Sequence, residues 1–75
     1  MPGMKTLADY TVVVRPDDGT WVAYVPAIAG CHTIGDTPEE ARNELEGVFE
    51  VFRDDYAQHG ETLPDDVRQL VAVAG

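Results

Sequence analysis

The sequence predicts a small α+β domain, in which three short antiparallel strands form a meander and one long helix packs against them. Two observations lead to this fold class. Residues 7–34 contain three segments rich in β-branched and aromatic side chains, separated by turns that contain proline and glycine. Residues 38–59 then carry apolar side chains at helical spacing.

A β-hairpin is predicted over residues 7–25. Residues 7–15 and 21–25 are rich in valine and aromatic side chains, which favour extended backbone. Residues 16–20, Pro-Asp-Asp-Gly-Thr, have turn chemistry because proline presets φ, aspartate bonds nearby amides and glycine accepts a positive φ. Residues 1–6 carry no pattern and are expected to form a loose end.

A third strand is predicted over residues 31–34. Pro26 ends the second strand because it has no N–H to donate to the ladder. Residues 27–30 then form a short connector, and the third strand ends at Gly35. The three strands are therefore expected to pair in chain order as an antiparallel meander.

A long helix over residues 38–59 is the clearest local prediction. Thr37 and Glu40 have the spacing of a capping box, with Pro38 at the first helical position, and Gly60 is typical of the residue that follows a helix. The apolar stripe of this helix is Ala41, Leu45, Val48, Phe49, Phe52 and Tyr56. The polar side is Arg42, Asn43, Glu46, Glu50, Arg53 and Asp54.

The last segment, residues 67–74, leaves two interpretations open. Residues 65–69 could begin a helical turn, whereas residues 70–74, Leu-Val-Ala-Val-Ala, suit a buried strand. We prefer a fourth strand that returns to the sheet through a right-handed crossover. Residues 1–75 are then predicted to form a single domain with a core over about residues 7–74.

The chain is strongly acidic, since five Lys and Arg residues against 14 Asp and Glu residues give a formal net charge of −9. This charge repels phosphate and disfavours direct binding of nucleic acid or of an anionic membrane. No apolar stretch approaches the roughly 20 residues that span a bilayer, and residues 1–5 lack the apolar core of a signal peptide. A cytoplasmic protein without a membrane segment is therefore expected.

The small size of the chain points to self-association. Cys31 is the single cysteine, which excludes an intramolecular disulfide and a multi-cysteine metal site. A domain this small buries only about 60% of its unfolded surface and is marginally stable alone. A homodimer or higher homo-oligomer is the expected source of additional stability.

No catalytic, cofactor or metal site is predicted. Cys31 and His32 are neighbours on a strand, so their side chains point to opposite faces and cannot form a nucleophile–base pair. His59 is explained as a cation near the negative end of the helix dipole. The carboxylates gather at the turn, at the helix start and in the last loop, which indicates a solvated acidic surface. The protein is therefore not expected to be an enzyme.

The hairpin has apolar side chains on both of its faces. Tyr10 lies in the first strand, and Trp21 and Tyr24 lie in the second, interleaved with valines. A single helix covers only one face of a sheet, so the other face is expected to be an association surface. The sequence does not decide which residues lie on which face, because a bulge in the loop would exchange them.

One family pattern covers most of the chain. After a hydrophobic strand come Asp17-Asp18-Gly19, an aromatic strand, Val25-Pro26, Gly30-Cys31, Thr33, Gly35-Asp36-Thr37 and Glu39-Glu40-Ala41 at the start of an amphipathic helix. In this order and spacing, residues 10–60 resemble the HicB antitoxin family of type II toxin–antitoxin systems. The resemblance implies a partial RNase H-like fold, with a fourth strand beside the first, that is not a nuclease.

The resemblance also implies a partner. HicB-like proteins bind and mask the small basic ribonuclease toxin HicA, usually as dimers or higher oligomers. Full-length members add a C-terminal DNA-binding domain, and none is expected in this sequence, which ends at Gly75. The residues expected to contact a partner protein are Asp17, Asp18, Trp21 and Tyr24.

Two other functions remain open at this stage. The chain could be an orphan homo-oligomeric HicB-like domain that has another ligand or a scaffolding role. It could also be a small hydrolase with carboxylate or Cys–His chemistry, although the sequence gives this reading little support.

Overall fold

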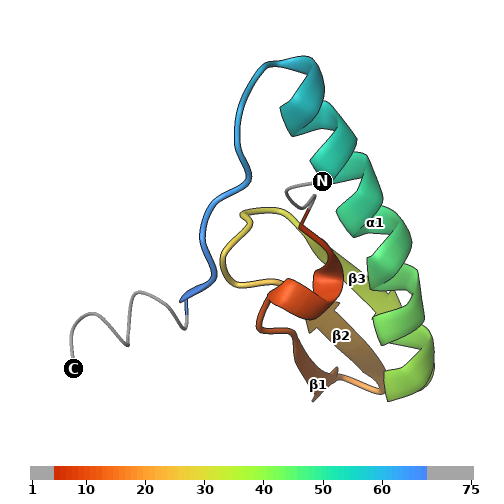
Figure 1. Ribbon diagram of the computed structural model, residues 1–75. Helices are drawn as coiled ribbons and strands as arrows, with labels where there is room; N and C mark the ends of the chain where they lie inside the picture. The colour runs from red at the N-terminus through yellow and green to blue at the C-terminus, as the bar shows by residue number, and fades with distance from the viewer. Residues whose placement is uncertain (1–4, 68–75) are drawn as a thin grey trace, which may run out of the picture.

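The fold has one sheet and one long helix, as described by a computed structural model for residues 5–67. A short 3-10 helix, η1 (Leu7–Asp9), precedes the strands β1 (Val13–Asp17), β2 (Thr20–Tyr24) and β3 (His32–Gly35), and the helix α1 (Pro38–Gln58) follows. The strands form an antiparallel sheet in the order β1-β2-β3, and α1 lies across one face of it (Figure 1). These elements confirm the predicted α+β class.

The first strand begins later than predicted, because residues 7–9 form η1 instead of extended backbone. The side chain of Asp9 folds back and accepts a hydrogen bond from the Thr6 amide at 2.8 Å, which closes a helical turn. This turn buries Leu7 in the core. The predicted strand over residues 7–15 is therefore wrong in its first half.

The hairpin turn is also shorter than the predicted residues 16–20. Pro16 and Asp17 belong to β1, and Pro16 pairs with Trp21. Only Asp18 and Gly19 remain in the turn, with φ values of 52° and 85°. Two consecutive residues with positive φ suit the right-handed twist of a tight hairpin, and Asp and Gly tolerate that backbone better than most residues.

The strand register sorts the side chains onto two faces. The inner sheet face is directed toward α1 and contains the paired residues Val14, Ala23 and Thr33, followed by Pro16, Trp21 and Gly35. The outer sheet face contains the paired residues Val13, Tyr24 and His32, followed by Arg15, Val22 and Ile34, and then by Asp17 and Thr20 next to the turn. The face assignment that the sequence left open is thereby settled.

The apolar stripe of α1 packs on the inner sheet face as predicted. Ala41, Leu45 and Phe49 are at most 2% exposed, and Val48, Phe52 and Tyr56 pack against the same core. A buried hydrogen bond joins the two layers, since Thr33 Oγ1 donates to the Ala41 carbonyl at 2.6 Å. Gly35 lets the layers approach, because a Cβ atom there would lie 2.6 Å from the Ala41 nitrogen.

The start of α1 forms only half of the predicted capping box. Thr37 Oγ1 accepts from the Glu40 amide at 3.1 Å, as expected for an N-cap. The Glu40 carboxylate accepts instead from the Asp36 amide at 3.2 Å, one residue earlier than a capping box requires. The helix ends at Gln58, one residue before the predicted end, and Gly60 follows with a φ of 68°.

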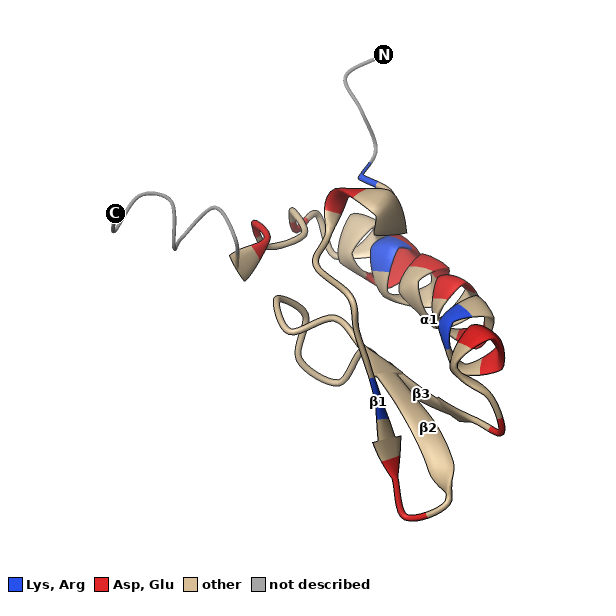
Figure 2. Cartoon of the chain, turned by 90° about the horizontal axis from the view of Figure 1, so that it is seen from below, with Lys and Arg blue, Asp and Glu red and all other residues tan. Residues whose placement is uncertain are grey.

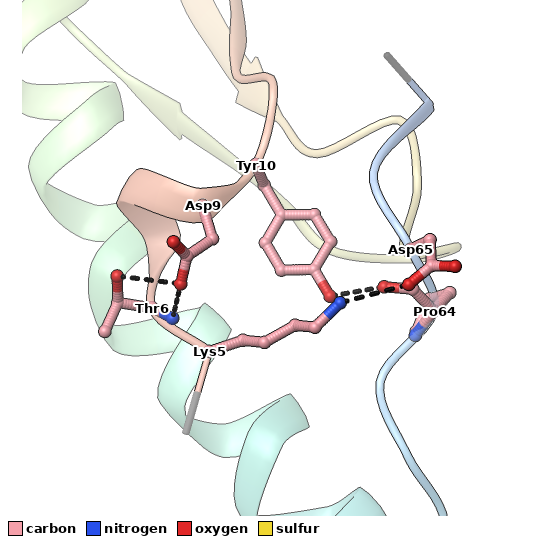
Figure 3. A network of polar contacts seen from close by, with 6 residues as sticks. All are labelled: Lys5, Thr6, Asp9, Tyr10, Pro64 and Asp65. Carbon is pink, nitrogen blue, oxygen red and sulfur yellow. Dashed lines mark hydrogen bonds and ion pairs between the residues drawn. The ribbon is translucent and has the colours of Figure 1, made fainter. Parts of the chain in front are cut away.

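The segment after α1 returns to the beginning of the chain through a polar network (Figure 3). Lys5 Nζ binds Asp65 at 3.2 Å, and the Tyr10 hydroxyl donates to the Pro64 carbonyl. The loose end predicted for residues 1–6 is therefore wrong for Lys5. Asp66 is 3% exposed and accepts from the amide and the hydroxyl of Thr11, both at 2.8 Å.

Two further expectations concern the same end of the molecule. Arg53, predicted on the polar side of the helix, is half-buried and donates from Nη1 to the Lys5 carbonyl at 3.4 Å. It leaves the polar side because residues 5–9 fold over that part of α1. The fourth strand and its crossover fall largely on residues 68–75, which lie outside the residues described.

Candidate functional site

Two surfaces combine features that a partner could recognise, and they differ in chemistry. The first is the outer sheet face, which α1 does not cover. The second, named here the acidic end, comprises the exposed carboxylates of the tight hairpin turn and of the start of α1: Asp17, Asp18, Asp36, Glu39 and Glu40.

The outer sheet face is apolar at its centre. Val22 and Tyr24 on β2 are half-buried by their neighbours, and Ile34 on β3 is 63% exposed. The basic side chains Arg15 and His32 flank this centre, and Asp17 follows in the next pair along β1. Large apolar side chains on a solvent-facing sheet are unusual where the sheet has no partner.

A hollow of about 540 Å³ adjoins the outer sheet face. It opens between the sheet and the connector from β2 to β3, which is folded tightly because Cys31 N donates to the Ile28 carbonyl at 3.1 Å. Its main lining residues are Arg15, Val22, Tyr24, Pro26, Ala29 and His32. The outer sheet face thus has both a projection, at Ile34, and a recess.

The acidic end gathers carboxylates from two separate segments. The hairpin turn and the start of α1 follow the same end of the sheet, because Trp21, close to the turn, pairs with Gly35, which precedes α1. Asp17, Asp18 and Glu39 are exposed. In Figure 2 acidic residues colour the hairpin turn and the outer side of α1, whereas the strands are otherwise almost uncharged.

The four residues predicted to contact a partner do not lie on one surface. Asp17 and Asp18 lie at the hairpin turn, and Trp21 lies on the inner sheet face, half-buried against the core. Tyr24 lies on the outer sheet face. The structure therefore divides the four residues among the hairpin turn, the inner sheet face and the outer sheet face.

Sequence reasoning did not single out Ile34 or Arg15 for the outer sheet face. The signal was present in the alternation around Thr33, because buried Thr33 requires its neighbours His32 and Ile34 to point away from the core. Reading that signal required the strand register, which a two-residue turn sets differently from the predicted five-residue turn.

The residues with reactive side chains are held in structural positions. Cys31 is 1% exposed in the core, and this burial raises the pKa of its thiol. His32 points to the opposite face, as the sequence analysis expected. His59 lies at the end of α1, with Nδ1 2.8 Å from the Asp55 carbonyl oxygen. This placement suits a cation at the negative end of a helix.

Two structural features are absent from the described part of the chain. Residues 5–67 contain no group of three or more His, Cys, Asp and Glu side chains arranged to hold a metal ion. Among these residues, no helix has the length and apolar character that crossing a membrane requires.

The fold and surfaces together define a small α+β protein whose helix covers one face of a three-stranded sheet. The chain belongs to the UPF0150 family. It is 34% identical over 65 residues to the UPF0150 protein Ta0767 of Thermoplasma acidophilum, covering 85% of this chain and 94% of the relative. It is also 35% identical over 57 residues to the UPF0150 protein ssl0259 of Synechocystis, covering 75% of this chain and 78% of the relative.

A third relative has a similar level of identity. The UPF0150 protein ssr1765 of Synechocystis is 30% identical over 63 residues, which cover 83% of this chain and 80% of the relative. No family model matches the chain. No solved structure matches it either.

Proposed function

We propose that this protein is an antitoxin-like binding module of the HicB kind, which binds and masks a small basic ribonuclease toxin of the HicA type. The observation that carries the proposal is the distribution of its charge. The formal net charge of −9 is carried mostly outside the strands, with acidic residues at the hairpin turn and along the outer side of α1 (Figure 2). A basic partner is the binding partner that such a surface attracts.

The acidic end also offers an anchor for contact. Trp21 is half-buried at the edge of the core, so its ring is fixed in place while part of it faces solvent. Tryptophan is enriched in protein interfaces and among the residues that contribute most to binding. In this proposal Asp17 and Asp18 steer the basic partner toward the acidic end, and Trp21 supplies apolar contact.

The motif order from Tyr10 to Gly60 supports the HicB assignment. The elements that carry that motif are β1, β2, β3 and the start of α1, and the acidic end is built from the same segments. Binding over a toxin's active site requires no catalytic group on this chain, so the proposal asks only for surface complementarity.

Calorimetric titration with a small basic ribonuclease toxin of the HicA type tests the proposal. The Asp17→Asn/Asp18→Asn variant should bind about tenfold or more weakly at low salt, and the difference should shrink as salt screens the charges. The matched control is Asp54→Asn/Glu61→Gln, which removes two exposed carboxylates at the other end of α1. This control should bind nearly as the parent chain does.

A ribonuclease assay completes the test. The parent chain should suppress RNA cleavage by the basic protein at stoichiometric amounts, and the Asp17→Asn/Asp18→Asn variant should require more protein for the same suppression. Absence of binding at low salt to HicA-type proteins would contradict the proposal.

A further inference from the structure

We propose that the hollow beside the connector from β2 to β3 is a binding site for a small organic acid. Arg15 would bind the single carboxylate of this acid, and a compact apolar group would lie over Val22 and Tyr24. The hollow and the acidic end are different surfaces, so this site is independent of the proposed function.

The hollow has an apolar lining and a floor made of core residues. The floor residues are at most 2% exposed, and they are Val25, Ile28 and Cys31. Val22 and Tyr24 of β2, both half-buried, border the hollow on the side of the sheet. The Val25 amide donates to the Cys31 carbonyl at 3.0 Å and joins the two ends of the connector, so the backbone fixes the shape of the hollow. Preformed, mostly apolar recesses of this kind are typical of small-molecule sites.

Arg15 is the cation that is free to bind an anion at this hollow. It lines the hollow and is exposed, and its side chain makes no hydrogen bond or ion pair within residues 5–67. The other Lys and Arg side chains among these residues have partners, since they contact a carboxylate or a carbonyl: Lys5 with Asp65, Arg42 with Glu46, and Arg53 with the Lys5 carbonyl. A free guanidinium beside an apolar surface favours a carboxylate, which it can bind through two parallel hydrogen bonds.

Asp17 limits the charge of the anion that can bind. It follows Arg15 on the same face of β1, toward the turn, and it does not line the hollow. Its carboxylate and the net charge of −9 repel a phosphate or a polyphosphate more strongly than an anion with one charge. A monocarboxylate is therefore the anion that best suits a hollow with one arginine.

His32 supplies a second polar group on the opposite side of the hollow. It pairs with Tyr24 from β3, is exposed and lines the hollow. Strands about 4.8 Å apart with about 3.3 Å per residue place the Cα atoms of Arg15 and His32 about 12 Å apart. The volume of about 540 Å³ is in the range of small-molecule sites. A compact acid can therefore lie between the guanidinium and the imidazole, whose ring N–H can donate to an acceptor on the ligand.

A titration of the isotope-labelled chain with phenylpropionate, followed by NMR at about pH 7 and low salt, tests the proposal. We expect a dissociation constant of roughly 1–5 mM, as suits a ligand of this size. The amide shifts should be largest for the residues that line the hollow. Phenylpropionamide has the same apolar body without the charge, and it should bind about fivefold more weakly.

The variant Arg15→Gln removes the charge at an exposed position and should leave the fold intact. It should weaken binding of phenylpropionate about fivefold and change binding of phenylpropionamide by less than about twofold. Arg15→Lys keeps the charge but loses the two-pronged geometry, so its affinity for phenylpropionate should lie between those of the parent chain and Arg15→Gln. The matched control is Arg42→Gln, because Arg42 is exposed on α1 and does not line the hollow. This control should bind phenylpropionate as the parent chain does.

Three results would overturn the proposal. The first is equal affinity of the parent chain for phenylpropionate and phenylpropionamide. The second is an equal loss of affinity in Arg15→Gln and Arg42→Gln. The third is a set of shifts at the hollow on simple dilution of the chain, because a second copy would then be its occupant. None of these results bears on binding of a basic partner at the acidic end, which is measured with that partner present.

Discussion

The two faces of the sheet have similar apolar character, yet they differ in the size of their central side chains. At the centre of the inner sheet face, Ala23 and Thr33 are small, and Gly35 follows them on β3. At the centre of the outer sheet face, Val22, Tyr24 and Ile34 are larger. Side-chain size therefore identifies the face that α1 covers better than polarity does, because a helix needs small residues where its backbone approaches the sheet.

The largest expected difference between the two faces is in how much a substitution lowers the free energy of unfolding. Phe49→Ala removes a side chain that is 2% exposed between α1 and the inner sheet face, and it should lower the free energy of unfolding by about 3–5 kcal/mol. A chain of this size is stabilised by only about 4–11 kcal/mol in total. The midpoint of thermal unfolding, followed by circular dichroism, should fall by tens of degrees.

Ile34→Thr is the matched change on the outer sheet face. It keeps the β-branched side chain on β3, and at dilute concentration it should change the free energy of unfolding by less than about 0.5 kcal/mol. Equal losses in Phe49→Ala and Ile34→Thr would mean that the two faces are equally buried in the folded monomer, contrary to the structure.

A pair of glycine substitutions probes how closely α1 approaches the sheet. Gly35→Ala should destabilise the fold by about 1–3 kcal/mol, because its Cβ atom would lie 2.6 Å from the Ala41 nitrogen and the backbone of α1 must move. Urea unfolding of the variant and of the parent chain measures this loss.

Gly47→Ala, within α1, should change the free energy of unfolding in the opposite direction. A Cβ atom at Gly47 meets no atom within 4 Å, so alanine there should stabilise α1 by about 0.5–1 kcal/mol. If both alanine variants gained stability, the close contact between Gly35 and α1 would be refuted.

The sequence predicted the elements whose signals are local. The stripe from Ala41 to Tyr56 and the Thr37 cap are periodic or adjacent in the chain, and the structure confirms them. The prediction of a strand over residues 7–9 was wrong because the Asp9 side chain accepts a hydrogen bond from the Thr6 amide. Such a local bond competes with extended backbone, and strand propensity does not take it into account.

The candidate surfaces were harder to predict than the elements. Asp17, Asp18 and Trp21 were expected to act with Tyr24, but Trp21 and Tyr24 are three residues apart on β2, so strand alternation puts them on opposite faces. The recess on the outer sheet face depends on the folded connector between β2 and β3. The conformation of that connector leaves no periodic signal in the sequence.

A single hydrogen bond is tested at Tyr10, which lies on the core side of the molecule and closes the network with Pro64. Tyr10→Phe removes one hydrogen bond and should lower the free energy of unfolding by about 0.5–1.5 kcal/mol near pH 7. Burial raises the pKa of the Tyr10 phenol, although the Lys5 ammonium, 5.6 Å from the ring centre, acts in the opposite direction.

The raised pKa of Tyr10 determines how the stability difference between the parent chain and Tyr10→Phe changes with pH. In the unfolded chain the phenol ionises near pH 10, whereas the folded chain keeps it protonated to a higher pH. The stability that Tyr10 contributes is thus complete below about pH 10 and falls as the pH rises further. The difference between the parent chain and Tyr10→Phe in urea unfolding should therefore shrink between about pH 10 and about pH 11.5. Cys31 is present in both chains, and the raised pKa of its buried thiol affects both equally. A difference that stayed constant to the top of this range would show that the Tyr10 hydroxyl is hydrated in the folded chain, which would place this end of the core open to water like the outer sheet face.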